Sequence, residues 1–269
     1  MAKSNPYLVE PNSKIKLSEY AADDTGHLNS KAKAEKLLEQ HRGKLFELQE
    51  LMYAEAKRSL LIVLQAMDAG GKDGTIRHIF TGINPQGCQV TSFKKPTEEE
   101  LRHDFLWRVH RATPAKGMIG IFNRSHYEDV LIVRVHGMLS KSELKDRFQA
   151  INDFEDLLVE NGTTILKFFL HISKDEQRDR LQARLDHPQK YWKVNPEDLK
   201  ERQYWDDYMD AYEDVFRQCS RKHAPWYIIP SNKKWYRNVA ISQIIVDALA
   251  GLQMKYPKSQ FDVSKMKVV

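Results

Sequence analysis

One stretch of the chain brings together residue types that bind phosphate groups. The apolar run Leu60–Leu64 is typical of a strand buried on both faces, and a segment rich in glycine follows within a few residues. Glycines let the backbone approach a phosphate closely, a lysine neutralises phosphate oxygens, and the N-terminus of the helix expected at Thr75–Phe80 adds partial positive charge. This order predicts a phosphate-binding loop formed by Gly70, Gly71, Lys72, Asp73 and Gly74.

The loop departs from the usual nucleotide-binding pattern G-x-x-x-x-G-K-[ST] in three ways. Ala66 stands where the first glycine belongs, and Asp73 replaces the Ser or Thr that would hold magnesium. Asp68 places a carboxylate inside the loop, where phosphates would repel it unless a cation lay between them. We therefore predict that Asp68 is a Mg²⁺ ligand. The alternative is a plain glycine turn that joins a strand to a helix.

A second group of polar side chains follows the strand expected at Met118–Asn123. Asn123 ends this strand, where P-loop enzymes often carry a metal-binding Asp, although its neutral amide is the weaker ligand. Arg124 can clamp a phosphate in a bidentate manner. Glu128 is predicted to bind the metal or to orient the acceptor, and the alternative is a surface carboxylate paired with an arginine. The predicted catalytic residues are Asp68, Lys72, Arg124 and Glu128, and the predicted metal ligands are Asp68 and Asn123.

Further basic residues occur at two places that could also reach a phosphate. Lys94 and Lys95 end the second expected strand, and a later helix carries three arginines within two turns, followed by a basic loop. We predict that this helix and loop form a lid that closes over phosphates. The alternative is a set of surface pairs with neighbouring Asp and Glu residues. Five aromatic residues are expected in the core or at an interface rather than against a base, namely Trp192, Trp205, Tyr208, Trp226 and Trp235. The phosphate-binding side chains predicted outside the loop are Lys94, Arg124, Arg178 and Arg184.

The chain as a whole is long enough for one large α/β domain. It has 269 residues, of which 41% are hydrophobic, and its net charge of +5 is a modest excess that is typical of a solvated basic surface. Cys88 and Cys219 lie far apart, which favours a reducing compartment. The polar N-terminus and the lack of a long apolar run predict a soluble, cytoplasmic protein without a membrane span.

Strands and helices alternate along the sequence, which predicts a mostly parallel five-stranded sheet flanked by helices. Strands are expected at 60–64, 88–93, 118–123, 163–172 and 226–229. Helices are expected at 30–57, 75–80, 97–112, 140–160, 173–187, 195–212 and 234–255. Ligands on such sheets bind beyond the carboxyl ends of the strands, where the polar groups described above lie. We predict an N-terminal arm at 1–29, one domain at 30–255 with a lid at about 173–200, and a C-terminal tail at 256–269.

These residues resemble the polyphosphate kinase 2 family. The matching segments are Met67–Gly74, Phe122–Val130, Leu170–Gln177, Tyr204–Tyr208, Ala224–Tyr227 and Lys234–Asn238. The resemblance implies a P-loop kinase fold with a helical lid. It also implies transfer of a phosphate from inorganic polyphosphate to a nucleotide, dependent on Mg²⁺, with Mn²⁺ as an alternative ion. By position, Asp68 matches the family's Walker A aspartate, Lys72 its phosphate-binding lysine, and Arg124 the arginine after its Walker B position.

Asn123 departs from the family pattern, because many members carry an aspartate there. Together with Glu128, it resembles the branch whose members accept both AMP and ADP, so these two residues are predicted to set acceptor specificity. The implied partners are polyphosphate, AMP, ADP and ATP, with no nucleic acid and no membrane. Members of the family commonly self-associate, which predicts a homo-oligomer, either a dimer or a tetramer.

Two other functions are compatible with parts of the sequence. A nucleoside monophosphate kinase that uses ATP would share the loop and the lid, but Asp68 and the missing Ser or Thr after Lys72 argue against it. A basic module that binds nucleic acid is a second alternative. Against this alternative, the sequence contains no recognised nucleic-acid-binding motif, and its aromatic residues are not interleaved with the basic ones.

Overall fold

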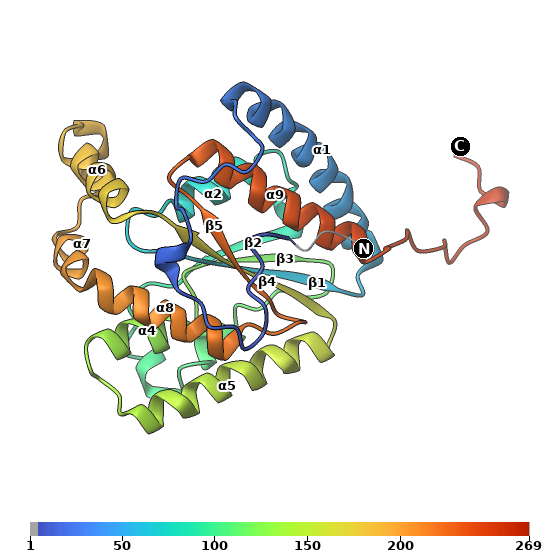
Figure 1. Ribbon diagram of the computed structural model, residues 1–269. Helices are drawn as coiled ribbons and strands as arrows, with labels where there is room; N and C mark the ends of the chain where they lie inside the picture. The colour runs from blue at the N-terminus through green and yellow to red at the C-terminus, as the bar shows by residue number, and fades with distance from the viewer. Residues whose placement is uncertain (1–4, 269) are drawn as a thin grey trace.

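The computed structural model describes residues 5–268, and its centre is a five-stranded sheet in the order β2-β3-β1-β4-β5 (Figure 1). All four pairings between these strands are parallel. The strands are β1 (Ser59–Gln65), β2 (Cys88–Ser92), β3 (Ile119–Asn123), β4 (Thr163–His171) and β5 (Trp226–Pro230). Every residue of β1 is buried, because this strand has a neighbour on each side and helices on each face. The expected parallel sheet is confirmed.

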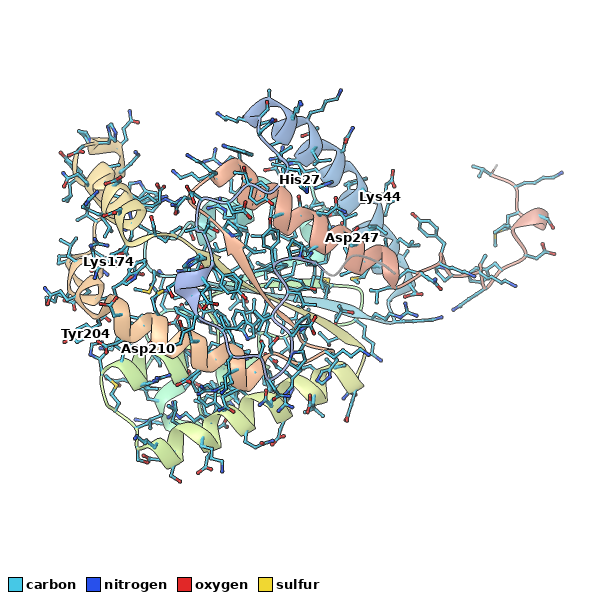
Figure 2. The ribbon with its side chains drawn as sticks, in the orientation of Figure 1. His27, Lys44, Lys174, Tyr204, Asp210 and Asp247 are labelled. Atoms are coloured by element: carbon cyan, nitrogen blue, oxygen red, sulfur yellow. The ribbon has the colours of Figure 1, made fainter. Side chains whose placement is uncertain are left out.

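Helices cover both faces of the sheet (Figure 1). The helices are α1 (Lys31–Glu55), α2 (Lys72–Ile79), α3 (Trp107–His110), α4 (Glu128–Val135), α5 (Lys141–Glu160), α6 (Lys174–Leu185), α7 (Pro196–Glu201), α8 (Trp205–Cys219) and α9 (Lys234–Gly251). One apolar cluster lies between the sheet and α1, α2 and α9, and a second lies between the sheet and α4, α5 and α8. Figure 2 shows side chains filling the space on both faces of the sheet.

Several helices begin where the sequence predicts, because a side chain caps their first turn. Ser30 accepts a hydrogen bond from the Lys33 N–H at the start of α1. Ser140 and Glu143 form a reciprocal capping box at the start of α5. At the start of α6, the Ser173 hydroxyl accepts a hydrogen bond from the N–H of Glu176.

The single helix expected over 97–112 is wrong. Thr97 and Glu100 do exchange the two hydrogen bonds of a capping box, at 2.8 and 3.2 Å. Only a 3₁₀ turn, Glu100–Arg102, comes after them, because His103 is extended and the side chain of Asp104 accepts the N–H of Leu106. The one-turn helix α3 then starts at Trp107. The capping pair therefore marks the start of a helical turn but does not determine how many turns form after it.

Other helices also differ from expectation, and α2 begins at Lys72 rather than at Thr75. The helix expected over 195–212 is divided into α7 and α8 by the 3₁₀ turn Arg202–Tyr204. Helix α4 was not expected at all. It begins directly after the polar residues that follow β3, and no side chain caps its first turn.

The N-terminal segment packs against the last strand of the sheet. The N–H of Val9 donates to the carbonyl of Trp226 at 2.9 Å, and the N–H of Ile228 donates to the carbonyl of Tyr7 at 2.9 Å. These bonds cover the exposed edge of β5. At the other end of the chain, the segment after α9 extends away from the body of the molecule (Figure 1). Among the described helices, none has the length and apolarity needed to cross a membrane.

A buried polar network lies behind the end of β3. Lys167 on β4 forms an ion pair with Glu155 on α5, and it also donates to the Tyr127 hydroxyl at 2.9 Å and to the Cys219 carbonyl at 2.7 Å. The Tyr127 hydroxyl donates to Glu155 at 2.8 Å, and a ring nitrogen of His126 lies 3.2 Å from the same carboxylate oxygen. The network thereby holds the segment immediately after Arg124 against the core. His126 itself is completely buried.

Candidate active site

A cavity of about 720 Å³ lies at the carboxyl ends of β1, β2 and β3, which is the expected edge of the sheet. We call it the strand-end cavity. Most of the predicted site residues line it together. They are Asp68, Gly70, Gly71, Lys72, Asp73, Gly74, Lys94, Asn123, Arg124 and Arg184. Glu128 and Arg178 are not among the lining residues.

The glycine loop passes from β1 to α2 in a conformation that only small residues permit. Gly71 has a φ of 105°, and a β-carbon added at Gly70 would lie 2.4 Å from the β-carbon of Ala66. Lys72 is the first residue of α2, and its ammonium donates to the Ala66 carbonyl at 3.0 Å. Burial and the nearby Arg124 lower the pKa of Lys72 to about 8. The loop amides, the helix N-terminus and this lysine together form a site for an anion.

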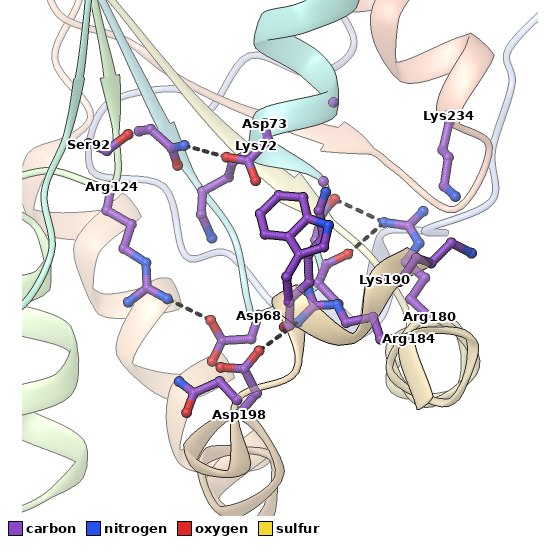
Figure 3. A pocket seen from close by; sticks show the side chains of 18 of the residues that line it. Asp68, Lys72, Asp73, Ser92, Arg124, Arg180, Arg184, Lys190, Asp198 and Lys234 are labelled. Atoms are coloured by element: carbon purple, nitrogen blue, oxygen red, sulfur yellow. Dashed lines mark hydrogen bonds and ion pairs between the residues drawn. The ribbon is translucent and has the colours of Figure 1, made fainter. Parts of the chain in front are cut away.

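Arg124 is the centre of an ion-pair group at the end of β3. Its guanidinium donates to Asp68 at 2.6 Å (Figure 3), and it also lies 3.9 Å from Glu128. Arg124 has a φ of 60°, which is uncommon for a residue with a side chain, and its N–H donates to the carbonyl of Leu64 at 3.1 Å. The negative charge of Glu128 raises the pKa of Arg124. Burial acts to lower this pKa, and Asp68 acts to raise it further. Glu128 is therefore placed to hold Arg124 in position.

Asn123 and Asp68 line the same cavity but have different partners. The Asn123 amide donates to Asp73 at 2.6 Å, whereas Asp68 accepts from Arg124 (Figure 3). Mg²⁺ in phosphate sites binds one or two carboxylates and takes its other ligands from phosphates and water. The carboxylate of Asp68 and the amide oxygen of Asn123 are oxygen donors of this kind beside a phosphate-binding loop, so the residues present fit the ion. Asp73, a negative side chain, would contribute to phosphate binding through its backbone N–H at the start of α2.

The lid arginines divide into two groups. Arg184 lines the cavity and donates to Asp198 on α7 at 2.8 Å and to the Lys193 carbonyl at 3.0 Å. Arg178 instead pairs with Asp175 at 3.0 Å and Asp179 at 3.1 Å on the surface of α6. The structure does not bring Arg178 to the site, because it lies on a different face of α6 from Arg184. For Arg178, the surface-pairing alternative describes the contacts that are present.

Arg180 is one of the three arginines of the predicted lid helix, but it is not among the side chains predicted to bind phosphate. It donates to the carbonyls of Ala69 at 3.1 Å, Gly70 at 3.0 Å and Ser231 at 2.7 Å, and to Glu176 at 2.7 Å. It thereby joins α6 to the glycine loop. The sequence carries one signal for it, which is its spacing of four residues from Arg184 on the same face of the helix.

Trp192 does not lie in the core, so of its two expected positions only the interface remains a prediction. Trp192 is 78% exposed, and it lines the cavity from the 3₁₀ segment Pro188–Lys193 that follows α6. The ammonium of Lys193 lies 4.7 Å from the centre of its ring. The expectation of burial is confirmed for Trp205 and Trp226, which pack in the main core.

Comparisons with known proteins agree with this geometry. Residues 28–257 match the family Polyphosphate kinase 2 (PPK2). An AMP/ADP-polyphosphate phosphotransferase of Meiothermus ruber is 51% identical over 97% of this chain and 98% of its own length. An ADP-polyphosphate phosphotransferase of Rhodopseudomonas palustris is 46% identical over 96% of this chain and 93% of its own length.

A solved structure supports the same assignment. The crystal structure of Polyphosphate Kinase 2 from Arthrobacter aurescens has a TM-score of 0.91 and 49% sequence identity, and the match covers 96% of this chain and 95% of that chain. Every residue that lines the strand-end cavity lies within residues 28–257, the part of the chain that matches the family. The chain belongs to the polyphosphate kinase 2 family.

Proposed function

We propose that this protein transfers a phosphate from inorganic polyphosphate to AMP and to ADP, producing ADP and ATP, with Mg²⁺ as the metal ion. The observation that carries the proposal is the cavity in which the glycine loop, the Asp68–Arg124 pair and the lid residue Arg184 meet. The relative from Meiothermus ruber, whose name states both acceptors, supports the choice of AMP and ADP.

The chemistry needs positioning and charge neutralisation more than covalent participation by the protein. An oxygen of the nucleotide's terminal phosphate attacks the terminal phosphorus of the chain, and the bridging oxygen leaves on the shortened polyphosphate. The N–H groups of the loop and Lys72 would bind the donor phosphates. Arg124 would release Asp68 and bind the transferred group, and Arg184 would close over it from the lid. Mg²⁺, held by Asp68 and Asn123, would neutralise charge between the phosphates when bound.

The test is to incubate the protein with AMP, Mg²⁺ and polyphosphate and to separate the nucleotides by chromatography. We expect ADP first and ATP later. A parallel incubation with ATP in place of polyphosphate distinguishes a nucleoside monophosphate kinase, for which ATP would be the better donor. RNA binding without turnover in either incubation would support the nucleic-acid alternative instead.

We predict that Asn123→Asp changes the balance between the two acceptors. A carboxylate at this position adds negative charge beside Asp73, which lies 2.6 Å from the present amide. The charge changes how closely a metal ion and the acceptor's phosphates approach this end of β3. The ratio of kcat/KM for AMP to that for ADP should change by about tenfold, the scale of one such electrostatic difference. Asn123→Ser, which is smaller and neutral, is the control, and an unchanged ratio in Asn123→Asp would dismiss the specificity role.

We also propose that the protein is a cytoplasmic homo-oligomer. Its nucleotide substrates and its two free thiols support a reducing compartment. Helix α1 supports self-association, because Phe46 and Tyr53 are 44% and 48% exposed on it. Size-exclusion chromatography coupled to light scattering measures the oligomeric state directly.

A further inference from the structure

Arg237, in the first turn of α9, is a buried cation beside the glycine loop. Arg237 is only 1% exposed, yet it is one of the residues that line the strand-end cavity. A β-carbon added at Gly71 would lie 2.1 Å from its Nη1, and one added at Gly74 would lie 3.5 Å from its Nη2. The guanidinium therefore packs directly against the loop and the first turn of α2.

The contacts of Arg237 leave its charge unbalanced. Nε and Nη2 donate to the neutral side-chain oxygen of Asn238, at 3.1 and 2.9 Å. Within residues 5–268, Nη1 has no hydrogen-bond partner and no carboxylate forms an ion pair with Arg237. Buried charges in proteins are normally paired and fully hydrogen-bonded. Arg237 is an exception that requires an explanation.

The surroundings of Arg237 increase the imbalance. Burial and the neighbouring Arg180 lower its pKa to about 9. The guanidinium also lies at the N-terminus of α2, where the helix dipole favours negative rather than positive charge. Arg180 is different, because Glu176 and backbone carbonyls accept its hydrogen bonds. The arrangement is unfavourable for the protein alone and becomes favourable when an anion binds between these groups.

We propose that Arg237 and the backbone of Gly71–Gly74 form a phosphate subsite at the far end of the glycine loop from Asp68, a proposal that rests on the proposed function. The ligand class is a phosphate group of a polyanion, held by Nη1 of Arg237 and by N–H groups at the start of α2. Any larger residue at Gly71, whose φ of 105° already favours glycine, would displace Nη1 of Arg237. The subsite would hold part of a substrate rather than the transferred group, which belongs near Arg124.

Two substrates could supply this phosphate, and the cations nearby favour the longer one. Lys190 and Lys234 line the same cavity, and Arg180 and Lys190 both lower the pKa of Lys234, after burial. Figure 3 shows these basic side chains gathered on the side of the cavity opposite Arg124. Several cations close to Arg237 suit a polyphosphate chain better than the short phosphate group of a nucleotide.

The experiment compares the purified full-length wild type with Arg237→Met, Arg237→Lys and the control Arg217→Met. Arg217 is a half-exposed arginine on α8 that pairs with Asp214. The thermal midpoint is measured without ligand, with tripolyphosphate and with ADP, and KM and kcat are then measured for polyphosphate and for ADP. Met replaces Arg237 with an unbranched apolar chain and removes an unpaired buried charge. We therefore expect the ligand-free midpoint of Arg237→Met to equal or exceed that of the wild type.

In Arg237→Met, tripolyphosphate should raise the midpoint less than in the wild type, and KM for polyphosphate should rise about tenfold or more, the scale of one charged hydrogen bond. For both quantities, Arg237→Lys should give values between those of the wild type and Arg237→Met. Arg217→Met should give wild-type values. Loss of the response to tripolyphosphate alone identifies the donor chain as the ligand, and loss of the response to ADP alone identifies the nucleotide.

A lower ligand-free midpoint with unchanged KM and unchanged ligand response would overturn the subsite, because it would show a purely structural arginine. If Arg237→Met does not fold, Arg237→Lys decides, since a normal midpoint with a raised KM supports the subsite and an unchanged KM contradicts it. A wild type that binds tripolyphosphate through Arg237 but does not phosphorylate AMP or ADP would contradict the proposed function and leave the subsite standing.

Discussion

Replacing Asp68 with Asn should lower kcat by about 10²–10³-fold, the usual cost of removing one electrostatic group that acts in the transition state. The change removes a negative charge and almost nothing else, because Asn has the same size and its oxygen can still accept the hydrogen bond that Arg124 donates at 2.6 Å. The variant should therefore keep its fold. The measurement is the rate of ADP formation from AMP and polyphosphate at saturating Mg²⁺, with the thermal midpoint as a check on folding.

Asp153→Asn is the matched control for this variant. Asp153 is an exposed residue of α5 whose carboxylate accepts a hydrogen bond from Gln149 at 2.7 Å, away from the strand-end cavity. Its substitution should leave both the rate and the midpoint at wild-type values. An Asp68→Asn protein that turns over at the wild-type rate would refute the metal-binding role of Asp68.

Replacing Glu155 with Gln should destabilise the fold by about 3–5 kcal/mol, because it leaves the ammonium of Lys167 buried without a counter-charge. Both residues are at most 1% exposed, so water cannot take the place of the carboxylate. The double variant Glu155→Gln, Lys167→Met should recover much of the loss, since it contains neither charge. Urea unfolding of the wild type and both variants measures these differences. Equal stability of the single and double variants would show that the unpaired ammonium of Lys167 is not the cause of the loss.

The same pair predicts a dependence on pH. Burial acts to raise the pKa of Glu155, but Lys167 and His126 outweigh it, and the pKa lies below its ordinary value. A carboxyl group whose pKa is lower in the folded than in the unfolded protein stabilises the fold fully at pH values above its unfolded pKa. This contribution to the free energy of unfolding is lost as the pH falls through the folded pKa. The wild type should therefore lose stability more steeply on acidification below about pH 4 than the double variant does.

The strand-end positions were predictable because their signals are local. The apolar run of β1, the glycines after it and Lys72 lie within one short segment, and parallel strands necessarily bring Asn123 and Arg124 to the same edge of the sheet. Asn123 pairs in register with Leu64 at the end of β1, as that reasoning requires. The cavity at this edge could thus be inferred from the sequence alone.

Other features could not be predicted because they depend on contacts between distant parts of the chain. Arg237 belongs to an ordinary helix start in the sequence, and only the packing of α9 against α2 places it beside Gly71. Arg178 and Arg184 are both arginines of α6, and the sequence does not distinguish them. The orientation of α6 brings only Arg184 to the cavity. Helix α4 lacks a capping side chain, so nothing in the sequence marks its start.

The strand order has a consequence for how the chain acquires its shape during synthesis. Central β1 pairs with β3 and with β4, so both of its neighbours leave the ribosome long after it does. Until β3 and β4 have been synthesised, the apolar strand β1 is unpaired and can associate with other chains. Parallel pairing of strands that are far apart in the sequence is also intrinsically slow. The glycine loop, although it is encoded in one short segment, also receives hydrogen bonds from Arg180 on α6, which is synthesised only after β4.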